Sequence, residues 1–80
     1  MKIALKYFGL LADITNKKEE FFLLEESTIA VSLLKSKVEN TYQELKNTNY
    51  AIAVNQAMAS LDYIVKDQDV VAFLPPFAGG

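Results

Sequence analysis

The chain has 80 residues, enough for one small domain, and its formal net charge is −2, with eight lysines, no arginine and no histidine. Nucleic-acid binding normally uses a basic face in which arginine takes part, so this composition argues against it. The absence of cysteine excludes disulfides and thiolate metal sites and favours a cytoplasmic protein.

The apolar N-terminal stretch is interrupted by Lys6 and Asp13, so it lacks the unbroken core of a secretory signal. No segment approaches the roughly 20 apolar residues of a membrane-spanning helix. We therefore expect a soluble, cytoplasmic protein without membrane contact. Hydrophobic residues make up 51% of the chain, which implies either a dense core or an apolar surface kept for a partner.

Residues 2–8 alternate in polarity, with Ile3 and Leu5 on one face and Lys6 and Phe8 on the other. This period of two predicts a strand, and Lys6 marks its outer face. A short helical turn and a loop follow, in which Asn16 suits a left-handed backbone position. Residues 19–26 predict a second strand, which forms a hairpin with the first.

Residues 27–46 predict a helix of roughly five turns, with Ser27 or Thr28 as its N-cap. Its apolar stripe recurs every three or four residues. The stripe consists of Ala30, Leu34, Val38, Tyr42 and Leu45.

Three further strands are expected at residues 50–55, 57–60 and 70–74, with turns at Asn55–Gln56 and Asp67–Gln68. Residues 61–69 are expected to cross irregularly. The order β–β–α–β–β–β predicts an α+β fold, a mixed sheet with one main helix packed across it. In a chain of this size that arrangement is the ubiquitin-like β-grasp.

Side chains suited to catalysis are scarce. The acidic pairs Glu19–Glu20 and Glu25–Glu26 flank the second strand, where solvated charge is the simpler interpretation than an acid/base pair. Asp62, Asp67 and Asp69 lack the spacing of a calcium loop and suit turns instead. Lys2 and Lys66 have no pocket in the sequence that would make either a nucleophile. We expect no metal site and no autonomous enzyme.

The final stretch, LPPFAGG, differs from the rest of the chain because it holds both prolines and two of the three glycines. Pro75 and Pro76 favour an extended exit from the last strand. Gly79 and Gly80 carry no Cβ and can enter a channel too narrow for side chains. We therefore divide the chain into a domain at 1–74 and a projecting tail at 75–80.

Three stretches carry a resemblance to a known family: KYFGLLAD, AVNQAMASLD and KDQDVVAFLPPFAGG. In order and spacing they resemble the sulfur-carrier small subunits of molybdopterin synthase, which are ubiquitin-like proteins. The resemblance extends over nearly the whole chain, and its most specific part is the final block.

The resemblance implies that the carboxylate of Gly80 is adenylated, with ATP, by an activating enzyme related to those of ubiquitin. The adenylate then becomes a thiocarboxylate, which donates sulfur to cyclic pyranopterin monophosphate inside the large catalytic subunit. The complex implied is a heterotetramer of two small and two large subunits. The residues implied to enter the partner's channel are Pro75, Pro76, Phe77, Ala78 and Gly79. No cofactor is expected on this chain itself.

The sequence departs from the family pattern at three positions. Glycine is frequent in the family where Asn16 and Gln68 stand, and a smaller apolar residue where Phe77 stands. Asn16 can keep the backbone that glycine would adopt. Gln68 is less suited to a positive φ, so that turn is expected to differ.

Three other functions remain open. The sulfur carriers of thiamine synthesis also end in Gly-Gly, but they lack this FLPPFAGG ending. A ubiquitin-like modifier would carry basic residues before the diglycine, where Ala78 stands. A plain interaction domain would not need its tail.

A tail of this length is a small contact, since a specific interface usually buries about 800 Å² per partner. The body of the domain should therefore contribute. Strand parity places Phe8 and Leu74 on the outer face, with Met58 nearby, and we call Phe8, Met58 and Leu74 the docking patch. The alternative is that all three belong to the core.

Overall fold

The first element of the fold is strand β1 (Lys2–Tyr7), in a computed structural model that describes residues 1–76. The strands that follow are β2 (Glu19–Leu23), β3 (Thr28–Ala30), β4 (Ala51–Val54), β5 (Ala57–Met58), β6 (Ile64–Lys66) and β7 (Val70–Leu74). The helices are α1 (Leu10–Thr15), α2 (Val31–Thr41) and the 3₁₀ helix η1 (Gln43–Asn47). None of them has the length and apolar character to span a bilayer.

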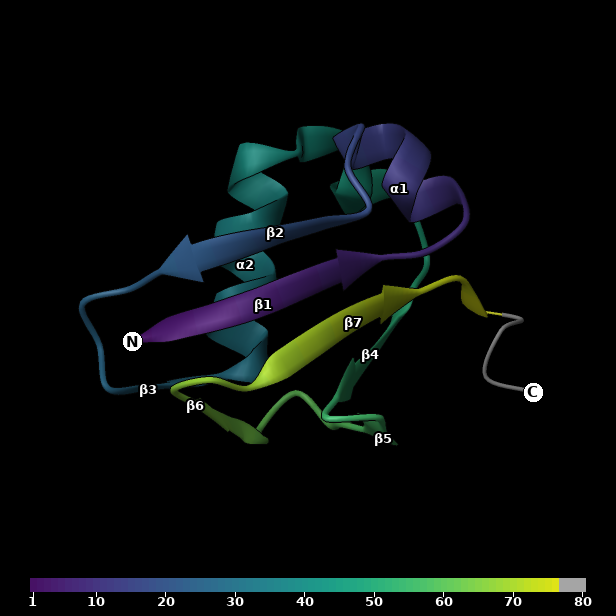
Figure 1. Cartoon of the computed structure of the whole chain (residues 1–80). Helices are drawn as coiled ribbons and strands as arrows, with labels where there is room; N and C mark the ends of the chain where they lie inside the picture. Colours follow the sequence, from purple (N-terminus) through teal and green to yellow (C-terminus); the bar gives the residue numbers. More distant parts are fainter. Residues whose placement is uncertain (77–80) are drawn as a thin grey trace.

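Five strands form a mixed sheet in the order β2-β1-β7-β4-β5, and α2 crosses one of its faces (Figure 1). The central pair, β1 and β7, is parallel, and the other neighbours are antiparallel. This is the β-grasp arrangement that the sequence predicted.

The core lies between this sheet and α2. Alternate residues of the central strands, such as Leu5 and Phe73, are fully buried because they face the helix. The predicted helical stripe meets them, with Leu34, Val38 and Leu45 also fully buried. Tyr42 packs at the margin of this core.

The predicted start of the main helix is wrong. Residues 28–30 form β3, which pairs with β6 in a separate two-stranded sheet. The helix therefore begins at Val31, with Ala30 as its N-cap, and neither Ser27 nor Thr28 caps it. The Val31 and Ser32 N–H groups instead donate to the carbonyls of residues 63 and 61, each at 2.9 Å. The region between residues 61 and 69, expected to be irregular, supplies β6.

The helix is also shorter than predicted. It ends at Thr41, and the stripe continues to Leu45 through η1. Tyr42 separates the two with φ −122°, so five continuous turns do not form. The strands expected at 2–8, 19–26 and 57–60 likewise end earlier, at Tyr7, Leu23 and Met58.

Within residues 1–76, four residues other than glycine adopt positive φ. Asn16 (φ 60°), Asn55 (φ 51°) and Gln56 (φ 71°) are turn positions that the sequence indicated. Gln68 also adopts a positive φ, 72°, although it is less suited to this conformation than glycine. Its N–H donates to the Lys2 carbonyl at 2.8 Å, and this contact outside the turn holds the conformation.

Candidate functional site

The face of the sheet opposite α2 has no helix over it in the described residues (Figure 1). The register places Lys6 beside Ala72, and Ala72 beside Ala53, which pairs with Met58. Directly paired residues point to the same face, so all four side chains belong to the outer face. The alanines give this face a flat floor between larger side chains.

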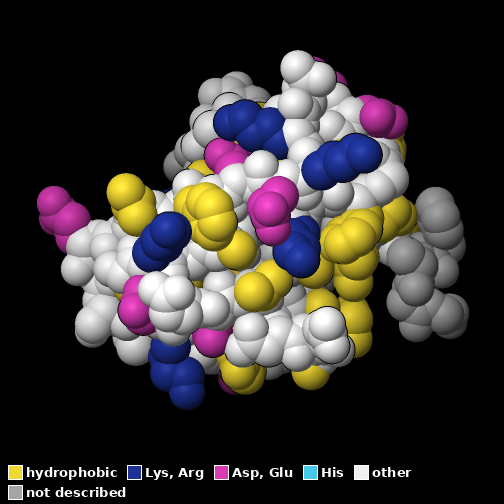
Figure 2. Space-filling view, viewed as in Figure 1, with side chains coloured by type: hydrophobic (Ala, Val, Ile, Leu, Met, Phe, Trp, Pro, Cys, Tyr) yellow, Lys and Arg dark blue, Asp and Glu magenta, His cyan; other side chains and the backbone are white. Residues whose placement is uncertain are grey.

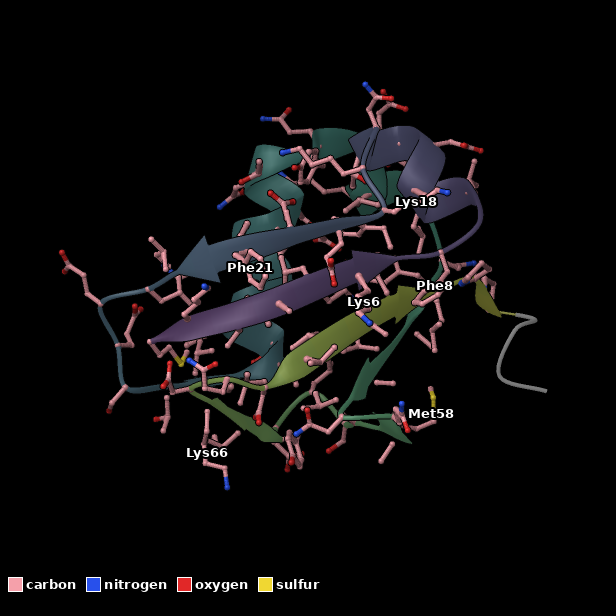
Figure 3. All side chains as sticks on the ribbon, viewed as in Figure 1. Lys6, Phe8, Lys18, Phe21, Met58 and Lys66 are labelled. Atoms are coloured by element: carbon pink, nitrogen blue, oxygen red, sulfur yellow. The ribbon has the colours of Figure 1, made fainter. Side chains whose placement is uncertain are left out.

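The docking patch lies on this outer face. Phe8 is 45% exposed and Met58 is 61% exposed, whereas Leu74 is half-buried. Figure 3 shows the labelled Phe8 and Met58 projecting from the same side of the sheet. Figure 2 shows hydrophobic side chains gathered over the C-terminal ends of β1 and β7. These positions make the patch accessible to a partner, and its role in docking remains a prediction.

A shallow depression of about 380 Å³ adjoins Phe8. It is lined by Lys6, Phe8, Asn55, Gln56, Val70 and Ala72. Lys6 also lies 4.0 Å from the Glu19 carboxylate, and both side chains are about half exposed. Apolar atoms make up most of the wall of this depression, and Lys6 supplies an accessible cation at its edge.

The chain leaves the sheet at Pro75, next to this face. Pro75 is buried and Pro76 is exposed. The other residues predicted to enter a partner, Phe77, Ala78, Gly79 and Gly80, lie outside the described residues. The division at residue 74 also remains a prediction.

Glu20 is a polar site that sequence reasoning missed, because acids near a strand end were expected to be solvated. Its Oε2 accepts hydrogen bonds from Tyr7 Oη at 2.6 Å and from Tyr42 Oη at 2.7 Å. Lys17 Nζ donates to Glu20 Oε1 at 3.3 Å and to Tyr42 Oη at 3.1 Å. The alternation of residues 19–23 could have indicated that Glu20 points inward, opposite to Phe21.

The hydrogen bonds decide the ionisation of this cluster. Burial alone would raise the pKa of Glu20, but the bonds from Tyr7, Tyr42 and Lys17 outweigh it and lower that pKa below its usual value. Burial, together with the Glu20 carboxylate, raises the pKa of the Tyr7 hydroxyl. Glu20 is therefore an ionised carboxylate whose two oxygens accept hydrogen bonds from three side chains. This arrangement suits a structural link between β2 and Tyr42, which precedes η1, better than proton transfer.

The remaining acids behave as the sequence predicted. Glu19, Glu25 and Glu26 are exposed. Asp67 accepts the Lys2 N–H at 2.7 Å, and Asp69 accepts the Lys66 N–H at 2.8 Å. Both aspartates therefore organise the turn before β7. Residues 1–76 contain no group of acidic, histidine or cysteine side chains that could hold a metal ion.

Comparison with known proteins adds to this geometry. The sequence model of the ThiS family matches residues 5–80, nearly the whole chain. The protein belongs to the ThiS family. The matched range includes the docking patch and the Gly-Gly end.

Solved structures similar to this ThiS-family protein include molybdopterin converting factor subunits and small archaeal modifier proteins. Molybdopterin converting factor subunit 1 from Pyrococcus furiosus is 28% identical over 95% of this chain and 98% of that chain, with a TM-score of 0.85. A complex of subunits 1 and 2 of molybdopterin-converting factor from Helicobacter pylori matches at 25% identity, with full coverage of both chains and a TM-score of 0.68. SAMP1 from Haloferax volcanii shares the fold at 17% identity, with full coverage of both chains and a TM-score of 0.82.

Proposed function

We propose that this ThiS-family protein is the sulfur-donating small subunit of a molybdopterin synthase and has no catalytic activity alone. The observation that carries the proposal is its similarity to molybdopterin converting factor subunit 1 over almost the full length of both chains. The Helicobacter pylori complex, which contains subunits 1 and 2 together, supports a large catalytic subunit as the partner.

The reacting group in this proposal is the carboxylate of Gly80. Its oxygen attacks the α-phosphorus of ATP on an activating adenylyltransferase, which forms an acyl adenylate and releases pyrophosphate. A sulfide equivalent then attacks the acyl carbon and displaces AMP, which leaves a thiocarboxylate. The sulfur of the thiocarboxylate bonds to cyclic pyranopterin monophosphate, and water then hydrolyses the acyl–sulfur bond, which leaves the sulfur on the substrate and returns the carboxylate. Because a dithiolene needs two sulfur atoms, spent carriers exchange for loaded ones.

The body of the domain would hold the carrier on the large subunit during this transfer. The outer sheet face is accessible, flat and apolar around Phe8 and Met58, as the centre of a protein interface requires. Pro75 leaves the sheet beside this face, so docking and tail insertion can occur together. Two such small subunits with two large ones would form the proposed heterotetramer.

The experiment is to recover the protein from cells with the activating enzyme and to measure its intact mass. A carrier is heavier by the mass difference between sulfur and oxygen, whereas a modifier forms isopeptide adducts on other proteins. Deletion of Gly80, or extension by one residue, should abolish sulfur loading and molybdopterin formation in vitro without changing thermal unfolding. The matched control is Lys46→Ala, an exposed change in η1. Normal molybdopterin formation by either tail variant would contradict the proposal.

Thiamine synthesis is the second candidate, because the matching family model is that of ThiS. A loaded carrier offered both a molybdopterin synthase large subunit and a thiazole synthase separates the two functions. We expect sulfur transfer only in the first reaction.

A further inference from the structure

Just beyond the ends of β1 and β7, where the two chain segments diverge, Gly9 lies against Pro75. Gly9 has φ 55° and ψ −131° and precedes α1. An L side chain rarely adopts this backbone conformation. A Cβ built on Gly9 would lie 2.9 Å from Pro75 Cγ, closer than real Cβ contacts. The pyrrolidine ring of Pro75 therefore packs on bare glycine backbone.

The backbone hydrogen bonds explain why the separation occurs here. In the parallel ladder the Phe8 N–H donates to the Phe73 carbonyl at 3.1 Å, and the next donor in this pattern would be the N–H of residue 75. Proline has no N–H, so the ladder ends without an unsatisfied donor. The Phe8 carbonyl instead accepts the Leu11 N–H at 3.1 Å, in the first turn of α1.

We propose that Gly9 is a positioning residue for the C-terminal tail. The absence of a side chain at Gly9 makes room for the Pro75 ring, and the buried ring sets the direction in which the chain leaves the domain at Pro76. Proline and glycine act as a pair: one ends the ladder and the other receives the ring. The inference rests on the proposed function in one respect only, the purpose of the exit direction, which is to present Gly80 to its partners.

The test is a distance measurement between two spin labels by double electron–electron resonance. The chain has no cysteine, so labels can be placed at Ser36→Cys, exposed on α2, and Ala78→Cys, in the tail. In Gly9→Ala the new Cβ displaces Pro75, and we expect the mean distance to shift by more than the width of the wild-type distribution. Pro75→Ala, which removes the ring and restores an N–H, should also shift it.

Two controls separate positioning from general destabilisation. Ile29→Ala weakens the core in β3, which belongs to the separate two-stranded sheet and lies far from the end of β7 (Figure 1), and should leave the distance unchanged. Adding Pro75→Ala to Gly9→Ala removes the colliding Cγ, so it should recover part of the unfolding midpoint without restoring the wild-type distance. A wild-type distance in Gly9→Ala or Pro75→Ala, or an equal shift in Ile29→Ala, would overturn the inference.

Adenylation kinetics test the purpose of the contact. With equal folded concentrations we expect Gly9→Ala to raise the KM of the activating enzyme for the carrier about tenfold, with kcat within about twofold of wild type, because only the fraction of carriers with the correct exit direction can bind productively. An unchanged KM would contradict a positioning role. Failure of wild-type protein to be adenylated would count against the proposed function, while the distance measurement would still decide the role of Gly9.

Discussion

At the residue scale, the main interaction absent from the sequence prediction is the cluster around Glu20. Tyr7 comes from β1, Tyr42 follows α2, and both hydroxyl groups donate to one carboxylate oxygen of β2. The cluster therefore connects an edge strand to the helix layer. In residues 1–76 no buried side-chain nitrogen or oxygen is left without a hydrogen-bond partner.

We expect Glu20→Gln to lower the free energy of unfolding at pH 7 by about 1–3 kcal/mol, because hydrogen bonds to a charged group are replaced by weaker ones. The folded-state pKa of Glu20 is below the unfolded value, so its contribution is present above the unfolded pKa of about 4.3 and is lost as pH falls through the folded pKa. Denaturant unfolding of both proteins between pH 7 and pH 2 should show the difference shrinking in acid.

The exposed neighbour Glu25 provides the control for this measurement. Glu25→Gln should change the unfolding free energy by about 0.5 kcal/mol or less at either pH. A stability loss in Glu20→Gln that stays constant down to pH 2 would show that shape, and not charge, accounts for it.

At the element scale, the start of α2 is set by tertiary contacts. Carbonyls from residues 61 and 63 accept the first helical N–H groups, so these donors do not need a serine or threonine cap. Ile29, in β3, is 4% exposed and belongs to the core, whereas Thr28 is exposed. The segment before the helix therefore contributes through burial and strand pairing.

This arrangement predicts opposite outcomes for neighbouring substitutions. Thr28→Ala should change the unfolding free energy by about 0.5 kcal/mol or less, because its hydroxyl caps nothing. Ile29→Ala should cost about 2–5 kcal/mol, as large-to-small changes in cores do. Urea unfolding gives both values. If Thr28→Ala costs as much as a lost N-cap, about 1 kcal/mol, then a side-chain cap forms in solution.

At the scale of the whole molecule, the two faces of the sheet differ in what covers them. The inner face packs on α2, whereas the outer face carries Phe8 and Met58 in contact with solvent. The end of β7 lies beside Phe8, whose N–H donates to the Phe73 carbonyl. This geometry gives the docking patch a test that separates binding from folding.

We expect Phe8→Ser and Met58→Ser each to cost about 0.5 kcal/mol of stability or less, because both side chains are already exposed. Each should weaken binding to a molybdopterin synthase large subunit by about tenfold or more. Truncating the anchor residue of an interface costs at least about 1 kcal/mol of binding free energy, and about 1.4 kcal/mol corresponds to tenfold. Calorimetric titration measures the affinity, and denaturant unfolding measures the stability.

Leu23→Ser is the matched control for the patch. Leu23 is 78% exposed on the far edge strand β2, outside the docking patch. Its substitution should leave the affinity unchanged. Equal losses of affinity in Leu23→Ser and Phe8→Ser would mean that the contact is not centred on the patch, and unchanged affinity in both patch variants would rule the patch out.

The sequence alone determined the features that depend on neighbours along the chain. The alternation in β1 predicted its faces, including the burial of Leu5 and the exposure of Lys6. Turn residues predicted the reversal at Asn55–Gln56, and the apolar stripe placed Leu34 and Val38 in the core. The final stretch, KDQDVVAFLPPFAGG, indicated the family. All of these signals are local, since parity, period and turn chemistry act over a few residues.

Only the tertiary structure decided the features that depend on distant partners. Residues 28–30 have the local signals of a helix start, but pairing with β6, some 36 residues later, makes them a strand. Lys2 fixes the positive φ of Gln68 from the other end of the chain. Glu20 meets Tyr7 and Tyr42 only when three elements pack together. Gly9 and Pro75 become a pair only because β1 and β7 are parallel neighbours. Such contacts join residues far apart along the chain, so no local pattern records them.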